Sequence, residues 1–315
     1  MVSLRKGLKG YRTLVLAVAG AALVIFGVLW ITVIFPALNK VPSNYEQSYY
    51  FEGEFSQMNP ATMGFDRFPI EQTLTQEAVG SEGGALLIHE VRSVVNAATG
   101  EDISAVYGDE STLAINPATL EFMPAVDERG RTGYWGPPKM LGEGDSFNLW
   151  NPGARQPLAA NYVRSESFQG LDVVVFETNQ VGIPIGTDPQ SGMSLFLSPM
   201  ITLWVEPTSG TVVNQTSTTT TSASVMGAMM PVQISKVDYT EATVAGLMDT
   251  ARSAKWMLLW FQTLIPWIAI GFGGLVTASA ASLAVAREVR KSRSRRRGEV
   301  PGSTSLPLDV QRSHR

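Results

Sequence analysis

The chain has 315 residues and a formal net charge of −4, and its apolar residues gather in two long runs, one near each end. It contains no cysteine, so disulfides are excluded. Because it has only two histidines, a zinc site is nearly excluded as well. A domain of about 200 residues between the two runs can bury enough apolar surface to be stable without disulfides or a structural metal.

The first apolar run covers residues 13–35 and predicts a transmembrane helix. It carries no charge, and about 20 apolar residues are enough to cross the hydrocarbon core of a bilayer. A cleavable signal peptide is the alternative, but its apolar region has only about 7–15 residues. We therefore expect an uncleaved span, preceded by a basic cytoplasmic segment over residues 1–12.

Residues 36–239 have the pattern of an all-β, antiparallel domain. Short runs rich in Val, Ile, Phe and Thr alternate with clusters of Gly, Pro, Asn and Asp, as in strands joined by turns. The Ser/Thr-rich stretch 217–224 fits either a low-complexity linker or a strand that continues from Thr211. The runs expected as strands are residues 85–91, 172–178, 201–205, 211–216 and 232–237.

Two stretches of this domain resemble each other and suggest a duplication. Residues 111–123 align with residues 201–213 without a gap, and Thr, Leu and Pro are identical at equivalent positions. A glycine turn and an apolar strand precede each stretch, so the repeats would cover residues 76–124 and 162–214. Chance similarity between two amphipathic hairpins is the alternative.

A duplication would fix how the two hairpins pack. Alternate residues of a strand point to opposite faces, so Leu113 and Ile115 should be buried together, as should Leu203 and Val205. Trp204 should then face the other side of its strand. There it would pack on a helix, on the first half of the domain, or on a bound apolar ligand.

After the strands, the spacing of apolar residues changes to that of a helix. Residues 240–258 predict a stalk helix, capped by Thr240 or Asp238. It leads into an uncharged second transmembrane helix over residues 259–286. The tail over residues 287–315 is basic and then rich in Pro, Ser and Gly, so we expect it to be disordered.

Charge predicts the side of the membrane on which each part lies. Residues 1–12 hold four basic residues and residues 287–315 hold nine, which leaves 11 of the 24 for the segment between, against 25 of the 28 acids. Basic flanks stay in the cytoplasm, so we expect both termini there and the acidic middle domain outside the cell membrane. Nucleic-acid binding is not expected, because no aromatic or folded module accompanies the basic run.

Small residues in the two spans predict a helix–helix contact, within one chain or between chains of a homo-oligomer. Small side chains let helix backbones approach closely in a bilayer. Pro266 in the second span also predicts a kink. The residues expected in the contact are Gly20, Gly27, Gly271, Gly274 and Ala278.

The order of these features resembles a known family. The two spans, the hairpin Ile201 to Val213 and the stretch Val237-Asp-Tyr-Thr-Glu-Ala-Thr-Val244 together look like the actinobacterial PorA-like family. The segment Phe147-Asn-Leu-Trp-Asn-Pro152 is similar to an aromatic–Asp-Pro stretch of that family, with Asn151 where Asp is usual. The resemblance implies a span at each end and a β-rich extracytoplasmic domain between them. It carries no catalytic residues over to this chain.

No arrangement of residues in the middle domain predicts catalysis. His89 is its one histidine, and no Gly-x-Ser-x-Gly stretch accompanies it. Acidic pairs in loops, such as Asp109/Glu110 and Asp127/Glu128, have oxygen ligands that suit Ca²⁺, but they lack the spacing of a calcium loop. We therefore predict no catalytic residue, no cofactor and no metal site.

Aromatic residues in Pro/Gly loops are the candidate ligand contacts, with buried structural anchors as the alternative reading. We expect a non-enzymatic membrane protein of the cell envelope whose domain binds an envelope lipid, glycan or protein, or has a structural role. A hydrolytic enzyme with a cleft and a channel-forming oligomer are the alternatives. The residues of the candidate groove are Tyr134, Trp135, Phe147, Trp150 and Trp204.

Overall fold

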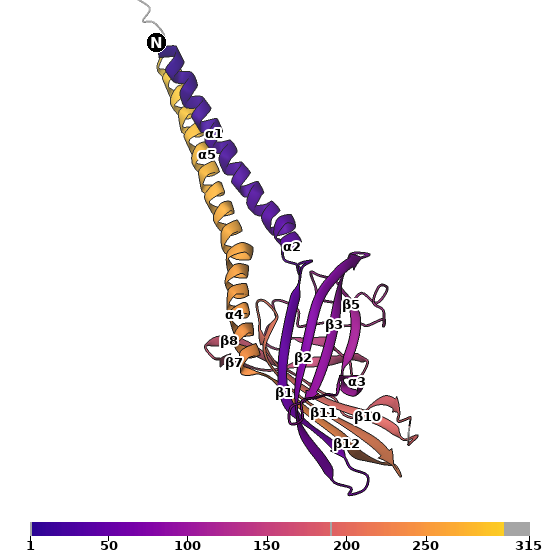
Figure 1. Ribbon diagram of the computed structural model, residues 1–315. Helices are drawn as coiled ribbons and strands as arrows, with labels where there is room; N and C mark the ends of the chain where they lie inside the picture. The colour runs from indigo at the N-terminus through magenta and orange to yellow at the C-terminus, as the bar shows by residue number, and fades with distance from the viewer. Residues whose placement is uncertain (1, 190, 299–315) are drawn as a thin grey trace, which may run out of the picture. The chain divides into compact units, whose positions relative to one another are not determined.

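The computed structural model describes residues 2–189 and 191–298 (Figure 1). The described chain forms two compact units. One is helical and combines the chain up to Ile34 with the chain from Thr263 onward, and the other runs from Phe35 to Gln262.

Two helical stretches are long and apolar enough to cross a membrane. They are Thr13–Leu38 and Glu241–Arg290, and they flank one large antiparallel sheet. The predicted fold class is confirmed: along the chain, one helix long enough to span a membrane comes before the all-β domain and another comes after it.

Each spanning stretch contains a π-helical turn close to a proline, Pro36 or Pro266. Proline has no N–H, and its ring pushes away the carbonyl four residues earlier, so the backbone widens there. A π-helical turn thus ends two residues before Pro266, while the kink predicted at this proline stays a prediction. In chain order the helical elements are α1 (Val2–Leu29), the π turn η1 (Trp30–Ile34), α2 (Phe35–Leu38), α3 (Ser104–Tyr107), α4 (Glu241–Leu258), the π turn η2 (Leu259–Leu264) and α5 (Ile265–Gly298).

The two ends of the second helical stretch differ in how well the sequence predicts them. Thr240 caps α4, because its hydroxyl accepts a hydrogen bond from the Thr243 backbone N at 3.3 Å. The disorder predicted after residue 286 is wrong for residues 287–298, which belong to α5. Extending an existing helix needs no new nucleus, and Arg, Lys and Glu are good helix formers. The remainder of the predicted tail, 299–315, lies outside the described residues.

The strands form a single antiparallel sheet in the order β4-β3-β2-β1-β12-β11-β10-β8-β7-β6, with β5 beside β3 and β9 beside β10. Their bounds are β1 (Glu46–Met58), β2 (Phe65–Glu82), β3 (Ala85–Asn96), β4 (Glu101–Asp102), β5 (Asp109–Ile115), β6 (Ser146–Asn151), β7 (Gln156–Phe168), β8 (Leu171–Asn179), β9 (Ile183–Thr187), β10 (Ser194–Glu206), β11 (Thr211–Val225) and β12 (Ala228–Tyr239).

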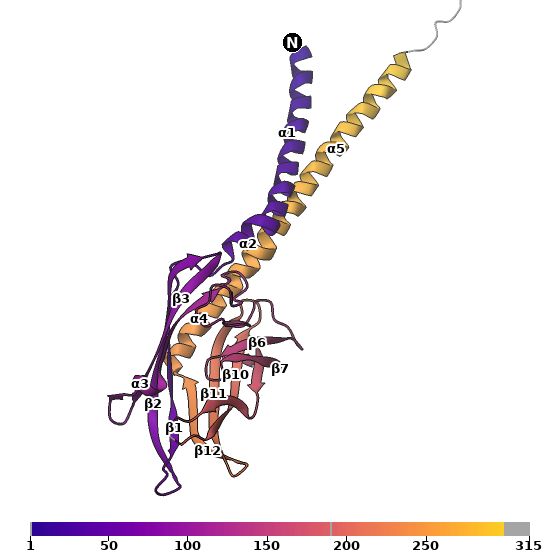
Figure 2. The same cartoon turned by 90° about the vertical axis from the view of Figure 1, so that its right-hand side faces the viewer.

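Isolated backbone bridges join the two ends of this sheet. Phe122 bridges Ile115 of β5, Glu121 bridges Tyr134, and Tyr134 bridges Leu149 of β6. The backbone pairing is therefore continuous around a ring, and the strands form a closed barrel. Figure 2 shows β1, β2 and β3 on one side of this unit and β6, β7 and β10 on the other.

Both predicted hairpins are present. Strands β10 and β11 pair directly, whereas β5 turns back only as far as the bridge between Ile115 and Phe122. Leu113 and Leu203 are both buried, with 3% and 2% of their surface exposed. Ile115 and Val205 are fully buried, so the packing predicted for both hairpins is confirmed.

The pairing of the two hairpins differs by one residue. Leu113 lies opposite Ile88, but Leu203 lies opposite Phe176. When the preceding strands are aligned as residues 83–90 and 170–177, Phe176 is equivalent to His89 and not to Ile88. The two halves thus share an order of elements and not a register, and their common origin stays a prediction.

The Ser/Thr-rich stretch 217–224 is part of β11, a central strand between β10 and β12, and not a linker. On the outer face of the barrel, α4 packs with Val244 and Met248 against Leu171, Val173 and Val213. The helix therefore covers β8 and β11 from outside, while the opposite faces of these strands point into the barrel.

Candidate ligand-binding cavity

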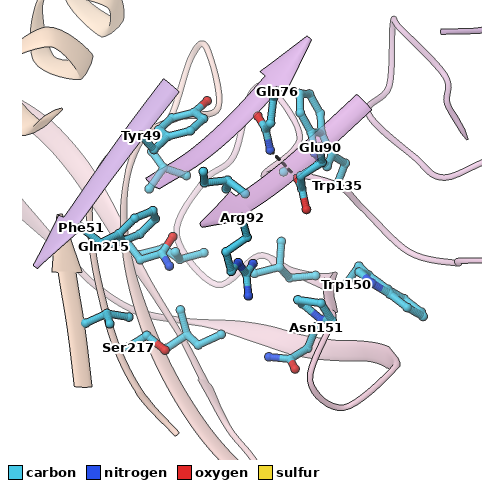
Figure 3. A pocket seen from close by; sticks show the side chains of 18 of the residues that line it. Tyr49, Phe51, Gln76, Glu90, Arg92, Trp135, Trp150, Asn151, Gln215 and Ser217 are labelled. Atoms are coloured by element: carbon cyan, nitrogen blue, oxygen red, sulfur yellow. Dashed lines mark hydrogen bonds between the residues drawn. The ribbon is translucent and has the colours of Figure 1, made fainter. Parts of the chain in front are cut away.

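The barrel contains a cavity of about 590 Å³. Its wall consists of alternate side chains of the strands, because successive residues of a strand point to opposite faces of the sheet. Figure 3 shows side chains of β1, β2, β3 and β11 converging on this space. On β1 and β11 the lining residues include Gln47, Tyr49, Phe51, Gln215, Ser217 and Thr219.

Part of the wall is aromatic and apolar. The ring of Tyr239 lies 4.8 Å from that of Phe51, and Phe55 lies 4.4 Å from Tyr107, measured between centroids. Phe55 also belongs to a buried cluster with Ile70 and Val94. This region can cover an apolar part of a ligand.

A chain of hydrogen bonds runs along another part of the wall. The hydroxyl oxygens of Tyr45 and Tyr49 lie 3.1 Å apart, and Tyr45 Oη donates to Gln76 Oε1 at 3.2 Å. Gln76 Nε2 in turn donates to Glu90 Oε2 at 2.7 Å. Burial raises the pKa of Tyr45 and of Tyr49 above the ordinary value, so both phenols stay protonated. The Glu90 carboxylate thus has a partner inside the protein.

Arg92 lies two residues beyond Glu90 on β3 and therefore on the same face of the strand, toward the cavity. Its Nε is buried and has no hydrogen-bond partner. No ion pair within 4.0 Å involves its guanidinium among the residues that the structure describes. In Figure 3 the side chain extends from β3 toward Asn151.

Loops fix one end of the cavity, where Gly136, Pro137 and Lys139 line it beside Gly210. Gly210 has φ +74°, and a Cβ there would come within 2.6 Å of the Pro137 carbonyl oxygen, so only glycine fits. Lys139 Nζ donates to Asn39 Oδ1 at 2.5 Å, and burial lowers its pKa.

Of the five residues of the predicted groove, Trp135 and Trp150 line the cavity. Tyr134 and Phe147 belong to a core cluster between β6, β8 and β10. Trp204 faces the outside of the barrel, where it packs under α4 and donates from Nε1 to Glu166 Oε1 at 2.5 Å. The structure therefore brings two of the five residues together at a ligand-sized space.

Of the residues predicted for the helix–helix contact, Gly20 and Gly27 face α5. A Cβ on Gly271 or Gly274 would meet nothing within 4 Å, and Ala278 is exposed. The close approach in α5 is made by Gly273 instead, whose added Cβ would lie 2.6 Å from the Gly20 carbonyl oxygen. One residue rotates the helix face by about 100°, which the spacing of small residues alone does not resolve.

Three polar residues of the cavity wall, Gln76, Glu90 and Arg92, were not predicted from the sequence. One signal was available. Glu90 and Arg92 lie on the same face of β3 as Ile88 and Val94, which are buried. Charged residues among the inward-facing apolar residues of a strand indicate either a polar interior or a buried ion pair.

Of the groups considered for catalysis or metal binding, Asp109 lines the cavity, whereas His89 and Asp127 are not part of its lining. His89 faces out of the barrel, with Nε2 3.5 Å from Glu110 Oε1. Asp109 and Asp127 form ion pairs with Arg129 and Arg131. Within the described ranges, no three His, Asp or Glu side chains are grouped so as to hold a metal ion.

Comparison with curated proteins gives no match. Among solved structures, the crystal structure of Rv2717c from M. tuberculosis matches with 9% identity over 67% of this chain and 99% of that chain, at a TM-score of 0.29. The model of the family described as "Porin PorA" matches residues 13–282, which include the first span and the whole barrel. This chain therefore belongs to the PorA family.

Proposed function

We propose that this protein is a membrane-anchored binding protein of the cell envelope, whose barrel holds a small molecule with an apolar part on the extracytoplasmic side. The observation that carries the proposal is the cavity of about 590 Å³ inside the barrel. Native interiors are packed like organic crystals, and voids much larger than a water molecule are few. Ligand pockets, by contrast, measure about 300–1,000 Å³.

The lining has the composition of a ligand pocket. Aromatic and aliphatic side chains such as Phe51 and Trp135 share the lining with many polar and charged groups, among them Gln76 and Arg92. Apolar walls supply affinity in such sites, and a small number of placed polar groups fix the orientation of the ligand. His89, the histidine expected in a hydrolytic site, faces away from this space.

The outer surface of the barrel favours a soluble domain over a membrane-crossing barrel. On β1 Glu52 lies opposite Asp238 of β12, and Glu54 lies opposite Lys236. Of these, Glu52, Lys236 and Asp238 are exposed. A barrel in a bilayer has an apolar band on its outside. The family description as a porin is thus not supported by strands that could face lipid, and a binding role fits the surface better.

Two cysteine variants test the proposal, because the chain has no other cysteine. Ser217 faces the cavity, and the next residue, Thr218, pairs with exposed Lys236 and faces out. The full chain carrying Ser217→Cys or Thr218→Cys is placed in nanodiscs of neutral phosphatidylcholine. The rate of modification by a water-soluble thiol reagent is then measured with and without decanol.

Modification at position 217 should be slower than at position 218, and decanol should slow it further at position 217 alone. The outward cysteine controls for partition of decanol into the bilayer. Equal rates at both positions, or no protection of position 217 by decanol or by any medium-chain amphiphile, would show that the cavity does not take up such molecules.

A further inference from the structure

We propose that the cavity selects amphiphiles with an anionic oxygen head group, a carboxylate or a phosphate, and that Arg92 binds that head. The inference deepens the proposed binding function and rests on it. It starts from a guanidinium that lines the barrel's cavity and forms no ion pair with the residues that the structure describes.

Arg92 carries a charge that it cannot lose, because a guanidinium stays protonated in proteins. Its Nε is buried without a hydrogen-bond partner. The residue as a whole is half-buried, and a charge partly removed from water is normally paired, since an isolated one is costly to desolvate. An anionic ligand would supply the missing partner.

The carboxylates nearest in the strands are already engaged. Glu90 accepts a hydrogen bond from Gln76 at 2.7 Å. Asp109, which pairs with Arg92 across the two strands, has its carboxylate bound to Arg129 at 3.0 Å. Neither comes within ion-pair distance of Arg92. Among the described residues, the Arg92 guanidinium thus has no carboxylate within 4.0 Å, so the cavity presents it with free donors and not in a closed salt bridge.

The surroundings of Arg92 fit an oxyanion. A guanidinium presents its donors in a planar fork that matches carboxylate and phosphate oxygens. Asn151 also lines the cavity; its side-chain oxygen accepts from the Ala154 N at 2.8 Å, which leaves its amide N–H groups as further donors. Figure 3 places both side chains in the same part of the space.

Another part of the lining fits an apolar tail. Phe51 and Phe55 line it on β1, and Ile70 lines it on the neighbouring strand β2. All three are almost fully buried. A ligand with one anionic end and one apolar end thus matches both parts of the lining, which neither an inorganic anion nor a neutral lipid does.

The test uses protection of the Ser217→Cys variant of the full chain in neutral nanodiscs, with Thr218→Cys as the control for bilayer effects. The probes are decanoate, decyl phosphate, decanol and inorganic phosphate. Decanoate and decyl phosphate should protect position 217 at concentrations at least about tenfold lower than decanol. Adding Arg92→Gln should abolish that difference, whereas Arg67→Gln, an exposed arginine paired with Glu54 outside the cavity, should leave it unchanged.

Arg92→Lys serves as a second variant if Arg92→Gln fails to fold. It keeps the positive charge without the fork, so the preference for decanoate over decanol should be smaller but retained. Protection by decanol equal to that by decanoate, unaffected by either change at Arg92, would overturn the inference and leave the proposed function standing. Inorganic phosphate as effective as decyl phosphate would overturn the assignment to amphiphiles. Absence of protection by every probe would refute the proposed function itself.

Discussion

Asp127 and Arg131 form the most buried ion pair among the described residues, with 0% and 3% of their side chains exposed. Asp127 also accepts hydrogen bonds from the backbone N of Ala114, Arg129 and Arg131. One carboxylate therefore ties the loop after the first hairpin to β5. Arg131 lies 6.0 Å from the centroid of Phe122, which carries one of the bridges that close the barrel.

Replacing Arg131 with Ala should destabilise the protein by about 3–5 kcal/mol, because it leaves a buried carboxylate without its counterion. Arg129→Ala is the matched control: its pair with Asp109 is partly exposed and should contribute about 1 kcal/mol or less. Chemical unfolding of the two variants measures the difference. Equal losses would mean that the buried pair has no special weight.

Buried tyrosines should make the fold sensitive to alkali. Burial raises the pKa of Tyr239 above its ordinary value of about 10, and Tyr45 and Tyr49 shift in the same direction. The unfolded chain therefore loses these protons first, so stability is fully present below about pH 10 and falls as the pH rises further.

Tyr239→Phe should reduce this fall by up to about 1.4 kcal/mol per pH unit above pH 10. Tyr50→Phe, an exposed tyrosine of β1, is the control and should leave the dependence as it is. Unfolding in denaturant measured at several pH values between about 8 and 11 gives the slopes. A Tyr239→Phe variant that loses stability with the same slope as the parent would contradict a role of this tyrosine in the pH dependence.

At the scale of elements, Gly53 determines how closely β1 and β12 approach. A Cβ there would overlap the Lys236 carbonyl group, although the residue is in an ordinary extended conformation. Gly80 in β2 has open space around the same position. The two glycines therefore make a matched pair within neighbouring strands.

Gly53→Ala should cost about 1–3 kcal/mol, because the strands must move apart to admit the methyl group. Gly80→Ala should be neutral or slightly stabilising, because it restricts the unfolded chain. Thermal unfolding of both variants compares them directly. A neutral Gly53→Ala would show that the two strands separate without loss.

The contact between α1 and α5 depends on one face of each helix. Gly273→Ile should disrupt it, since even a Cβ would lie 2.6 Å from the Gly20 carbonyl oxygen, whereas Gly274→Ile adds its side chain to open space. Cysteines in place of Gly27 and Ile270, which adjoin each other, report the contact through disulfide formation. The yield should fall in the Gly273 variant and persist in the Gly274 variant. The reverse order would assign the contact to the face predicted from the sequence.

At the scale of the whole molecule, the charges predict that both ends of the chain lie in the cytoplasm. Cysteines introduced at Ser81 and Ser191, both exposed, should react with an impermeant thiol reagent added to intact cells. A cysteine at Ser303, beyond the described residues, should react only after the membrane is permeabilised. Labelling at Ser303 in intact cells would reverse the orientation.

Local patterns in the sequence determined the class of each segment. These patterns are the uncharged runs long enough to cross a bilayer, the change of apolar period at Thr240, and the Pro/Gly turns. Each depends on neighbouring residues alone, so it can be recognised without knowing which distant residues the segment contacts. They do not identify β1 and β2, where Glu and Gln are frequent. These strands were not predicted, because their polar side chains line the cavity as well as the outer surface.

Only the tertiary structure decided that the sheet closes and what it encloses. The closure depends on Glu121, Phe122 and Tyr134, which pair through isolated bridges and carry no strand pattern. The cavity depends on strand register. Gln76, Glu90 and Arg92 line it because pairing with strands distant in the sequence sets which alternate residues of each strand face inward. The sequence by itself determined the two long apolar helices and most of the strands, since those are local, and the fold decided the site, since it is made of contacts between distant residues.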